Sequence, residues 1–226
     1  MKKLQQRLER EHIETIRRCG LLEGVKEADY ETVLESLQAR LYGVWEEEMI
    51  FLEGEEVTDL AILHSGTVRG EKFHLEGNVD LLYMYKRGEI FGAEAAVSRL
   101  KTSPLTYIAN ETAELILIDF AGAMRQSCRE GIMTALLHIL ADDNIKKLYK
   151  IETLSKRGMR DRIMTYLKII EKKAGKEVFS LHMDRNQLAQ YLCVNRSALS
   201  CELNRMKREG LIWFQKDRFK ILEKDK

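Results

Sequence analysis

The chain has 226 residues, a length that fits one large domain or two small ones. Hydrophobic residues make up 45% and charged residues 32%, which is typical of a soluble protein with a buried core. Neither an apolar run of the roughly 18 residues needed for a membrane span nor a signal-peptide region is present in the sequence. We therefore expect a cytoplasmic protein with no membrane partner.

The formal net charge of +1 conceals two oppositely charged parts. From residue 155 onward the chain carries 18 Lys and Arg against 9 Asp and Glu, a net of +9. Residues 1–154 carry 19 against 27, a net of −8. A basic C-terminal third beside an acidic remainder is typical of proteins that bind nucleic acid.

The cysteines and histidines do not predict a metal or haem site. Cys19, Cys128, Cys193 and Cys201 lack CxxC spacing, and the histidines form no HxxxH or similar pair. We predict no metal ligands and no cofactor, and a cytosolic setting argues against disulfides. Cys193 is expected to be a packed turn residue and Cys201 a thiol on a helix surface, with a redox switch at Cys201 as the alternative.

The N-terminal part changes from helical to strand-like texture. Residues 4–18 and about 26–41 are predicted to be helices. Residues 42–120 are short β-prone segments separated by glycine-bearing turns, which favours a small barrel or jelly roll. The Glu76-Gly77-Asn78 turn is predicted to be a hairpin tip.

A long helical segment follows from about residue 124. Its apolar residues spread over more than one face, as in a helix that contacts its own domain on one side and a partner helix on another. They are Ile132, Ala135, Leu136, Ile139, Leu140, Ile145, Leu148, Ile151 and Leu154. We expect dimerisation through residues 131–154; the alternative is a helix buried only against its own domain. Gly131 and the Asp142–Asn144 run are expected to interrupt it, and residues 155–158 to form a hinge at Gly158.

Residues 184–210 predict a helix-turn-helix. Asp184 with Gln187 has the spacing of a capping box, and Asn195 can cap a second helix. In that helix Leu199, Leu203 and Met206 form an inward stripe. The opposite face presents Arg196, Ser197, Ser200, Cys201 and Asn204, and Gly210 ends the helix. An ordinary helical hairpin with a solvated face would show the same pattern.

A basic hairpin after the second helix favours DNA binding over the plain hairpin. Residues 211–214 and 219–222 are β-prone runs around a tip at residues 215–218. A helix-turn-helix followed by such a hairpin is a winged helix, whose wing contacts phosphates while the second helix reads bases. The DNA-binding residues that we predict are Arg185, Asn195, Arg196, Ser197, Ser200, Cys201, Asn204, Lys216 and Arg218.

The order of these elements resembles the Crp/Fnr family of bacterial transcription regulators. The motifs that carry the resemblance are residues 184–210 and, in the roll, Glu53-Gly54, Ser65-Gly66 and Gly88-Glu89-Ile90-Phe91-Gly92. The resemblance implies an α+β fold with three parts. A double-stranded β-helix (jelly roll, cyclic-nucleotide-binding-like) domain spans 1–124, a dimerisation helix 125–154, and a winged helix-turn-helix 155–226. It also implies a homodimer on an inverted-repeat operator in double-stranded DNA, with RNA polymerase as a partner.

Two departures from the family affect base recognition. Arg196 occupies the family's first-turn arginine position and can form two hydrogen bonds to a guanine, although contact with phosphate alone is the alternative. The family often has Glu and Arg where this chain has Ser197 and Cys201, so the operator sequence of better-known relatives does not carry over.

The effector region departs further from cyclic-nucleotide binders. Those relatives have a Gly-Glu-Leu motif and, about ten residues on, an arginine that holds the cyclic phosphate. Here Gly92-Ala93-Glu94 places the acid one position late, and Ser103-Pro104 replaces Arg-Ser, with Arg99 as the nearby candidate for compensation. The cysteine pattern of oxygen-sensing members is also missing, with only Cys19 present. We expect an unknown small effector other than cyclic AMP, contacting Gly92, Ala93, Glu94, Arg99 and Ser103.

Two other hypotheses remain open. The roll could be a vestigial scaffold without a ligand, or a cupin-type metalloenzyme fused to a DNA anchor. The metalloenzyme requires a histidine cluster, for which His64 and His74 with Glu71 are the candidates. We favour a regulator that is not an enzyme.

Overall fold

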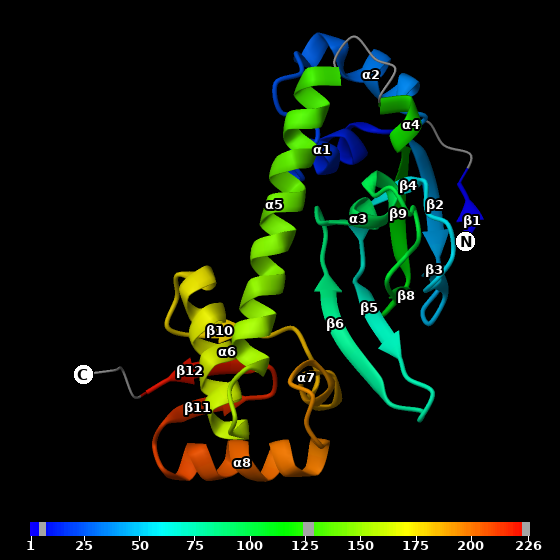
Figure 1. Ribbon diagram of the computed structural model, residues 1–226. Helices are drawn as coiled ribbons and strands as arrows, with labels where there is room; N and C mark the ends of the chain where they lie inside the picture. The colour runs from blue at the N-terminus through cyan, green and yellow to red at the C-terminus, as the bar shows by residue number, and fades with distance from the viewer. Residues whose placement is uncertain (5–7, 124–128, 223–226) are drawn as a thin grey trace. The chain divides into compact units, whose positions relative to one another are not determined.

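The structure, a computed structural model, describes residues 1–4, 8–123 and 129–222. The chain forms two compact units, Met1–Asp143 and Asn144–Lys226, which helix α5 (Arg129–Leu154) connects (Figure 1). Cys128 and the predicted boundary at residues 124–125 lie outside the described residues. None of the described helices is long and apolar enough to cross a membrane.

Within the described residues, the first unit is built on two antiparallel sheets with strand orders β1-β2-β9-β4-β7 and β3-β8-β5-β6. The strands are β1 (Lys2–Lys3), β2 (Arg40–Val44), β3 (Met49–Phe51), β4 (Asp59–Ser65), β5 (Val68–Phe73), β6 (Val79–Tyr85), β7 (Ile90–Phe91), β8 (Thr106–Ala109) and β9 (Ala113–Asp119). The helices are α1 (Arg10–Arg18), the 3-10 helix η1 (Glu27–Asp29), α2 (Tyr30–Ser36), α3 (Ala93–Val97), α4 (Phe120–Ala123) and the first half of α5. The predicted jelly roll is confirmed.

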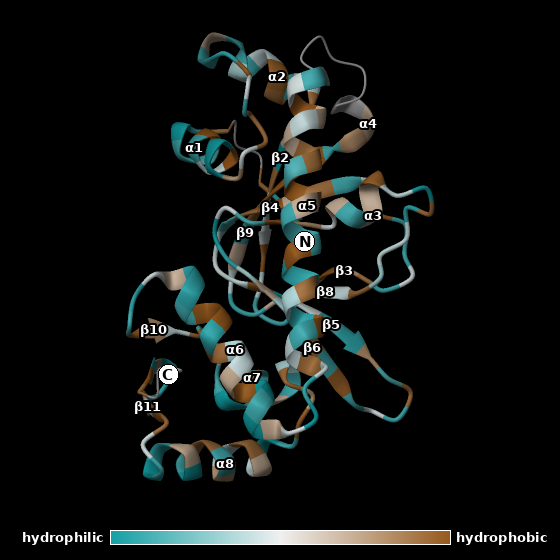
Figure 2. Cartoon of the chain, turned by 60° about the vertical axis from the view of Figure 1, so that its left-hand side comes forward, coloured by the Kyte–Doolittle hydropathy of each residue, from teal (hydrophilic) through white to brown (hydrophobic). Residues whose placement is uncertain are grey.

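The central strands of this roll are buried on both faces. Leu60 and Ile62 of β4 belong to a core shared with the helices, whereas Ala61 and Leu63 belong to the interior between the sheets. Because strand side chains alternate between faces, one nearly continuous apolar strand serves two cores. The antiparallel neighbour β9 divides in the same way, and Figure 2 shows hydrophobic residues along both strands.

Both predicted N-terminal helices were too long. The first begins only at Arg10, and Leu4, which follows β1, donates its backbone N–H to Leu41 O of β2 at 2.9 Å. The second ends at Ser36, and Leu41 pairs with Ile116 in the ladder between β2 and β9. Sheet pairing, which is not visible in a local pattern, overrides helical spacing at both places.

The predicted hairpin tip at Glu76–Asn78 is confirmed. It joins β5 and β6, and Gly77 N–H donates to His74 O at 2.9 Å. Gly77 has φ +83°, a left-handed conformation that glycine adopts without strain.

Helix α5 is continuous, so the breaks predicted at Gly131 and at Asp142–Asn144 are wrong. As predicted, apolar residues occupy more than one face of this helix. Ile132 and Leu136 are 1% exposed and pack in the first unit, whereas Leu137 is 67% exposed. Burial of one apolar face stabilises the helix against the low helix propensity of glycine, aspartate and asparagine.

The second unit is a winged helix. After the end of α5 it contains α6 (Met159–Ala174), β10 (Phe179–Ser180), α7 (Arg185–Tyr191), α8 (Arg196–Arg208), β11 (Ile212–Gln215) and β12 (Arg218–Ile221). The strands form an antiparallel sheet in the order β10-β12-β11. Because Gln215 pairs with Arg218, the wing turns at Lys216 and Asp217 alone, two residues fewer than predicted.

Gly66 and Gly77 differ in how closely the rest of the roll approaches them. A Cβ on Gly66 would lie 2.7 Å from Ala113 Cβ, whereas a Cβ on Gly77 would meet nothing within 4 Å. Both have a left-handed φ. We expect Gly77→Ala to lower the free energy of unfolding by about 1–2 kcal/mol through backbone strain alone. Gly66→Ala should lose roughly 1–3 kcal/mol more through overpacking, as measured by urea denaturation. Equal losses would contradict the close approach at Gly66.

Candidate DNA interface and effector region

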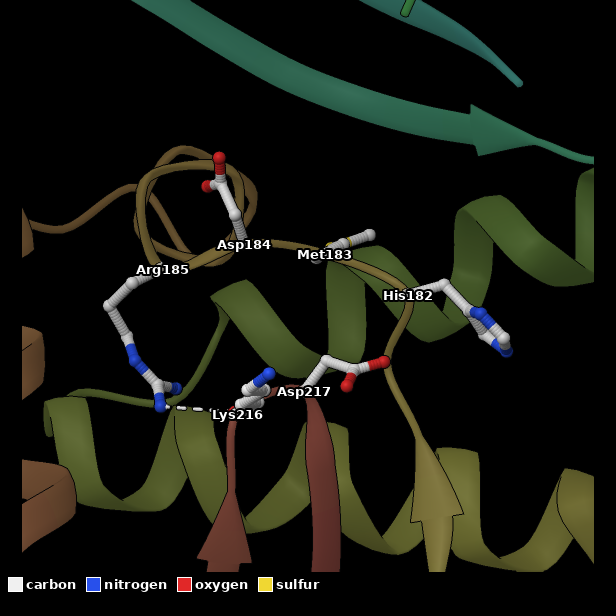
Figure 3. A pocket seen from close by; sticks show the side chains of 6 residues that line it. All are labelled: His182, Met183, Asp184, Arg185, Lys216 and Asp217. Atoms are coloured by element: carbon white, nitrogen blue, oxygen red, sulfur yellow. Dashed lines mark hydrogen bonds between the residues drawn. The ribbon is translucent and has the colours of Figure 1, made fainter. Parts of the chain in front are cut away.

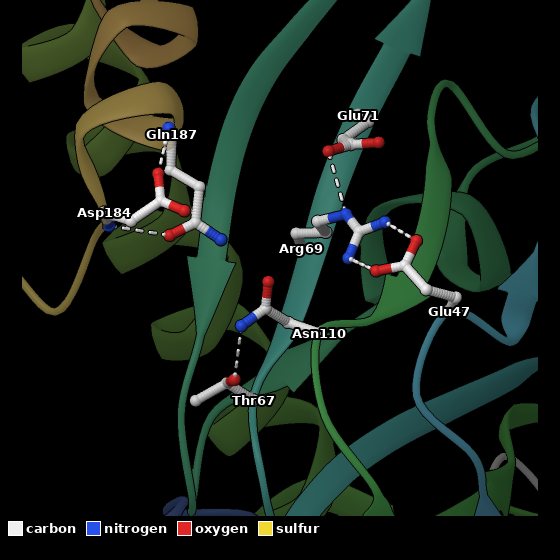
Figure 4. Close-up of polar contacts among 7 residues, drawn as sticks. All are labelled: Glu47, Thr67, Arg69, Glu71, Asn110, Asp184 and Gln187. Carbon is white, nitrogen blue, oxygen red and sulfur yellow. Dashed lines mark hydrogen bonds and ion pairs between the residues drawn. The ribbon is translucent and has the colours of Figure 1, made fainter.

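Both helices of the helix-turn-helix begin at the predicted caps. Asp184 Oδ1 accepts from Gln187 N–H at 2.7 Å, and Gln187 Oε1 accepts from Asp184 N–H at 2.9 Å (Figure 4). Asn195 Oδ1 accepts from the N–H groups of Ser197 and Ala198 and from the Ser197 hydroxyl at 2.6 Å. Asn195 and the Ser197 hydroxyl therefore hold the start of α8 in place.

The two faces of α8 differ as predicted. Leu199, Leu203 and Met206 are completely buried in the core of the winged helix. On the other side Arg196, Ser197, Cys201 and Asn204 are exposed, and Ser200 is half-buried. Figure 2 shows hydrophobic and hydrophilic residues alternating along this helix. The apolar stripe thus directs the polar side chains of the first two turns outward.

Ion pairs neutralise the acidic residues at this surface. Arg160 Nε lies 2.6 Å from Glu202, and its Nη1 lies 2.7 Å from Glu209. Arg205 also contacts Glu209, at 3.0 Å. Arg196, by contrast, forms no ion pair within the described part of the chain. Its charge is therefore available to a ligand outside the protein.

The wing is attached to α7 by Arg185. The Arg185 guanidinium stacks over the rings of Phe214 and Phe219, at 5.0 and 5.6 Å, and donates to Lys216 O at 3.3 Å (Figure 3). Burial lowers the pKa of Arg185. The contact supports the wing turn, where Lys216 and Arg218 are exposed.

A hollow separates the start of α7 from the wing turn. It is lined by His182, Met183, Asp184, Arg185, Lys216 and Asp217 (Figure 3). The Ser180 hydroxyl donates to the Asp217 carboxylate, which lowers the pKa of Asp217 and links β10 to the wing.

The effector residues predicted at the start of α3, Gly92, Ala93 and Glu94, are buried in the roll or in contact with its strands. Gly92 has φ +75°, and a Cβ there would meet the Phe51 ring at 2.8 Å. Ala93 is buried. Glu94 accepts a hydrogen bond from the Tyr107 hydroxyl, while its Oε2 atom is buried with no partner in the described residues. Burial, and then the charge of Glu94, raise the pKa of Tyr107.

Aromatic side chains, which the sequence analysis missed, fill the space beside Glu94. The rings of Phe91 and Tyr107 stack at 5.1 Å, and Tyr85 lies 5.4 Å from Phe91. Phe51 closes the cluster, 5.9 Å from Phe91. The signal was an aromatic residue at inward positions on several roll strands, but which positions face one another depends on sheet register.

The other predicted effector residues, Ser103 and Arg99, differ in their contacts. Ser103 is buried, donates its hydroxyl to Leu105 O at 2.6 Å and its N–H to Glu55 O at 2.9 Å. Arg99 is exposed and has no hydrogen bond or ion pair within the described residues. Ser103 is thus bound both within its own loop and to the loop between β3 and β4.

The sequence analysis also missed an arginine in the second sheet. Arg69 of β5 forms two hydrogen bonds to Glu47, at 2.7 and 2.5 Å, and one to Glu71 at 2.9 Å (Figure 4). The Arg69 guanidinium lowers the pKa of Glu47, whereas burial raises the pKa of Glu71. This guanidinium is already neutralised by two carboxylates.

The three candidates for a cupin-type metal site, His64, His74 and Glu71, do not form one cluster. Glu71 pairs with Arg69, and His74 lies 3.0 Å from Asp80 at the hairpin. His64 instead lies beside His12 of α1.

Comparison with known proteins agrees with this architecture. Residues 45–126 match the cyclic nucleotide-binding domain and residues 161–226 the Crp-like helix-turn-helix domain. The regulatory protein HlyX of Actinobacillus pleuropneumoniae is 24% identical over 197 residues, 81% of this chain and 78% of the relative. The electron transport regulator A of Shewanella oneidensis is 24% identical over 73% of this chain and 68% of the relative.

Solved structures share the fold. A mutant CooA from Carboxydothermus hydrogenoformans matches with a TM-score of 0.73 and 18% identity, over 90% of this chain and 92% of that chain. FixK2 from Bradyrhizobium japonicum matches with a TM-score of 0.68 and 16% identity, over 82% and 93%.

A cyclic-nucleotide-binding-type roll, a long helix and a Crp-like helix-turn-helix domain define a DNA-binding transcription regulator rather than an enzyme. This chain belongs to the Crp/Fnr family of such regulators.

Proposed function

We propose that this protein is a homodimeric regulator that binds an inverted-repeat operator in the bacterial cytoplasm, with RNA polymerase as its partner. Residues 1–124 would sense an effector, 125–154 dimerise and 155–226 bind DNA. The observation that carries the proposal is the first turn of α8, where Arg196 is exposed and unpaired in the described residues above a fully buried stripe.

Arg196 is the residue that we assign to base recognition. A guanidinium can donate two hydrogen bonds to O6 and N7 of a guanine in the major groove. Ser200, Cys201 and Asn204 follow on the same exposed side of α8 and would contact neighbouring bases or phosphates. Asn195 and Ser197 act by fixing the start of the helix, next to the DNA backbone.

The wing is assigned to phosphate contact. Lys216 and Arg218 are exposed at its turn, and Arg185 supports that turn from below through Phe214 and the Lys216 carbonyl. Cations in these positions add affinity without reading the base sequence.

An exposed apolar stripe on α5 supports the dimer. Leu137, Ala141, Asn144, Leu148 and Ile151 are all exposed and follow one another at spacings of four and three residues. This is the seam of a two-stranded coiled coil, and a polar Asn in such a seam specifies register. Leu148 is 57% and Ile151 63% exposed, whereas Leu136, which also lies in the predicted range 131–154, is buried in the first unit.

The effector that we propose is not cyclic AMP. In the roll, Arg69 is bound by Glu47 and Glu71, and Ser103 is bound by the backbone carbonyls of Leu105 and Glu55, so neither is free to hold a phosphate. Relatives in this fold differ in their signals; the CLP regulator of Xanthomonas campestris is described as responsive to c-di-GMP. A ligand-free roll is the alternative that the packed aromatic interior favours.

Cyclic AMP should therefore bind weakly or not at all. Each lost hydrogen bond to a charged group costs roughly 1.5–3 kcal/mol, so two losses lower affinity by a factor of hundreds or more. Calorimetry on the purified protein checks this. A micromolar Kd would contradict the assignment, and Arg99→Ala would then show whether Arg99 replaces the missing arginine.

Substitution in the α5 stripe should dissociate the dimer. We expect Leu148→Glu to shift sedimentation at micromolar concentration from dimer to folded monomer, because it places like charges in the seam. Leu148→Met keeps an apolar side chain of similar volume and should leave the dimer intact. A wild-type monomer, or a dimer in Leu148→Glu, would refute this interface.

Arg196 and Lys216 should differ in what they contribute to DNA binding. After selection from random duplexes, Arg196→Ala should lose about 1–3 kcal/mol and the preference at one base pair in each half-site. Lys216→Ala should weaken all sequences equally and flatten the salt dependence. Arg205→Ala, an ion-paired arginine on the same helix, is the matched control and should keep the preference. If Arg196→Ala and wild type enrich the same sites with equal affinity, the assignment fails.

A further inference from the structure

Three side chains with metal-binding groups meet where α1 lies against the five-stranded sheet. They are His12 of α1, His64 of β4 and Glu114 of β9, and one ligand atom from each lies within 4.8 Å of the other two. His12 is 6% and His64 7% exposed, while the Glu114 side chain is 43% exposed. We propose that these residues form a binding site for a divalent transition-metal ion such as Zn²⁺.

The sheet brings His64 and Glu114 together through an irregular register. β4 and β9 pair Leu63 with Leu115 and then Ser65 with Glu114, so the register shifts at His64. A bulge of this kind redirects the side chain of the extra residue. His64 Nε2 consequently lies 4.0 Å from Glu114 Oε2, too far for a hydrogen bond and close enough for both to contact one ion.

The hydrogen bonds around His64 prepare its Nε2 atom for coordination. The Thr15 hydroxyl donates to Glu11 O at 3.0 Å, so its oxygen can only accept from His64 Nδ1, which lies 3.0 Å away. The proton of the neutral ring is therefore on Nδ1, and Nε2 carries the lone pair. Metal-bound histidines in proteins have this arrangement, with the second nitrogen donating to a fixed acceptor.

His12 supplies its Nε2 atom only after a change of tautomer. Its Nδ1 accepts from Glu9 N–H at 2.9 Å, which puts the proton of the neutral ring on Nε2. Coordination at Nε2 moves that proton to Nδ1 and breaks the bond to Glu9. The ion would thus exchange one helix-capping bond for a direct link between α1 and the sheet.

The ligand set decides which ions fit. Two imidazoles and one carboxylate favour Zn²⁺, Co²⁺, Ni²⁺ or Cu²⁺ over Mg²⁺ and Ca²⁺. Bonds of about 2.0–2.2 Å in a tetrahedral site place ligand atoms roughly 3.3 Å apart, so the three groups must close by up to about 1.5 Å. The partly exposed Glu114 side chain is free to move toward the two histidines, and a water would complete four-coordination. Because the site joins α1 to β4 and β9, metal binding would fasten the N-terminal helix to the roll.

The test is titration of the chelator-treated full-length protein with Co²⁺, followed by displacement with Zn²⁺. We expect one equivalent of Co²⁺ per chain with the visible absorption of a four-coordinate ion, and a rise in Tm that depends on Zn²⁺ concentration. Glu114→Gln, a substitution of equal size at a partly exposed position, should weaken Zn²⁺ at least tenfold.

Two control variants and one measurement on the wild type complete the experiment. Glu111→Gln changes an exposed acid in the turn before β9, and His74→Gln removes the exposed histidine next to Asp80; both should bind Zn²⁺ as the wild type does. In the wild type, Zn²⁺ should shift the side-chain NMR signals of His12 and His64 and leave those of His74 unchanged. The proposal is overturned if no stoichiometric binding occurs, if Glu114→Gln binds normally, or if only His74→Gln loses binding.

Discussion

The burial of three side chains, Leu199, Leu203 and Met206, determines which side chains of α8 point outward. They are completely buried among residues of α6, α7 and the wing. Because a helix has 3.6 residues per turn, fixing one face fixes the opposite face. Arg196 and Asn204 are therefore exposed, although no hydrogen bond or ion pair within the described residues holds their side chains outward.

Ion pairs also neutralise the acidic side chains near the exposed face of α8. A recognition helix with unpaired acids would repel phosphates, and both Glu202 and Glu209 are bound by Arg160. Arg160 lies in the first turn of α6, so the same ion pairs fasten α8 to the first helix of this domain. Arg160 thus neutralises two carboxylates of the α8 region and also holds α8 in position.

Several polar side chains of the roll are paired with one another. Glu94 is bound to Tyr107, Arg69 to Glu47 and Glu71, and a stack of aromatic rings occupies the space between the sheets. An ion pair in a partly buried setting is stable only when both charges are matched, so recruiting Arg69 to a phosphate would leave two carboxylates unmatched. The domain therefore keeps the architecture of a nucleotide-binding roll with a different internal chemistry.

Local patterns in the sequence determined the parts of this protein that are built from neighbouring residues. The caps at Asp184 and Asn195, the stripe of α8, the hairpin tip at Gly77 and the wing strands follow from spacings of a few residues, and the structure has them all. Contacts between distant residues were decided only by the tertiary structure. Leu4 bonded to β2 and Leu41 became part of it, α5 ran through Gly131 and Asn144, and the groups around Glu94 and Arg69 came from separate strands. His12, His64 and Glu114 met in the same way, because pairing register and burial depend on the whole chain rather than on any short segment.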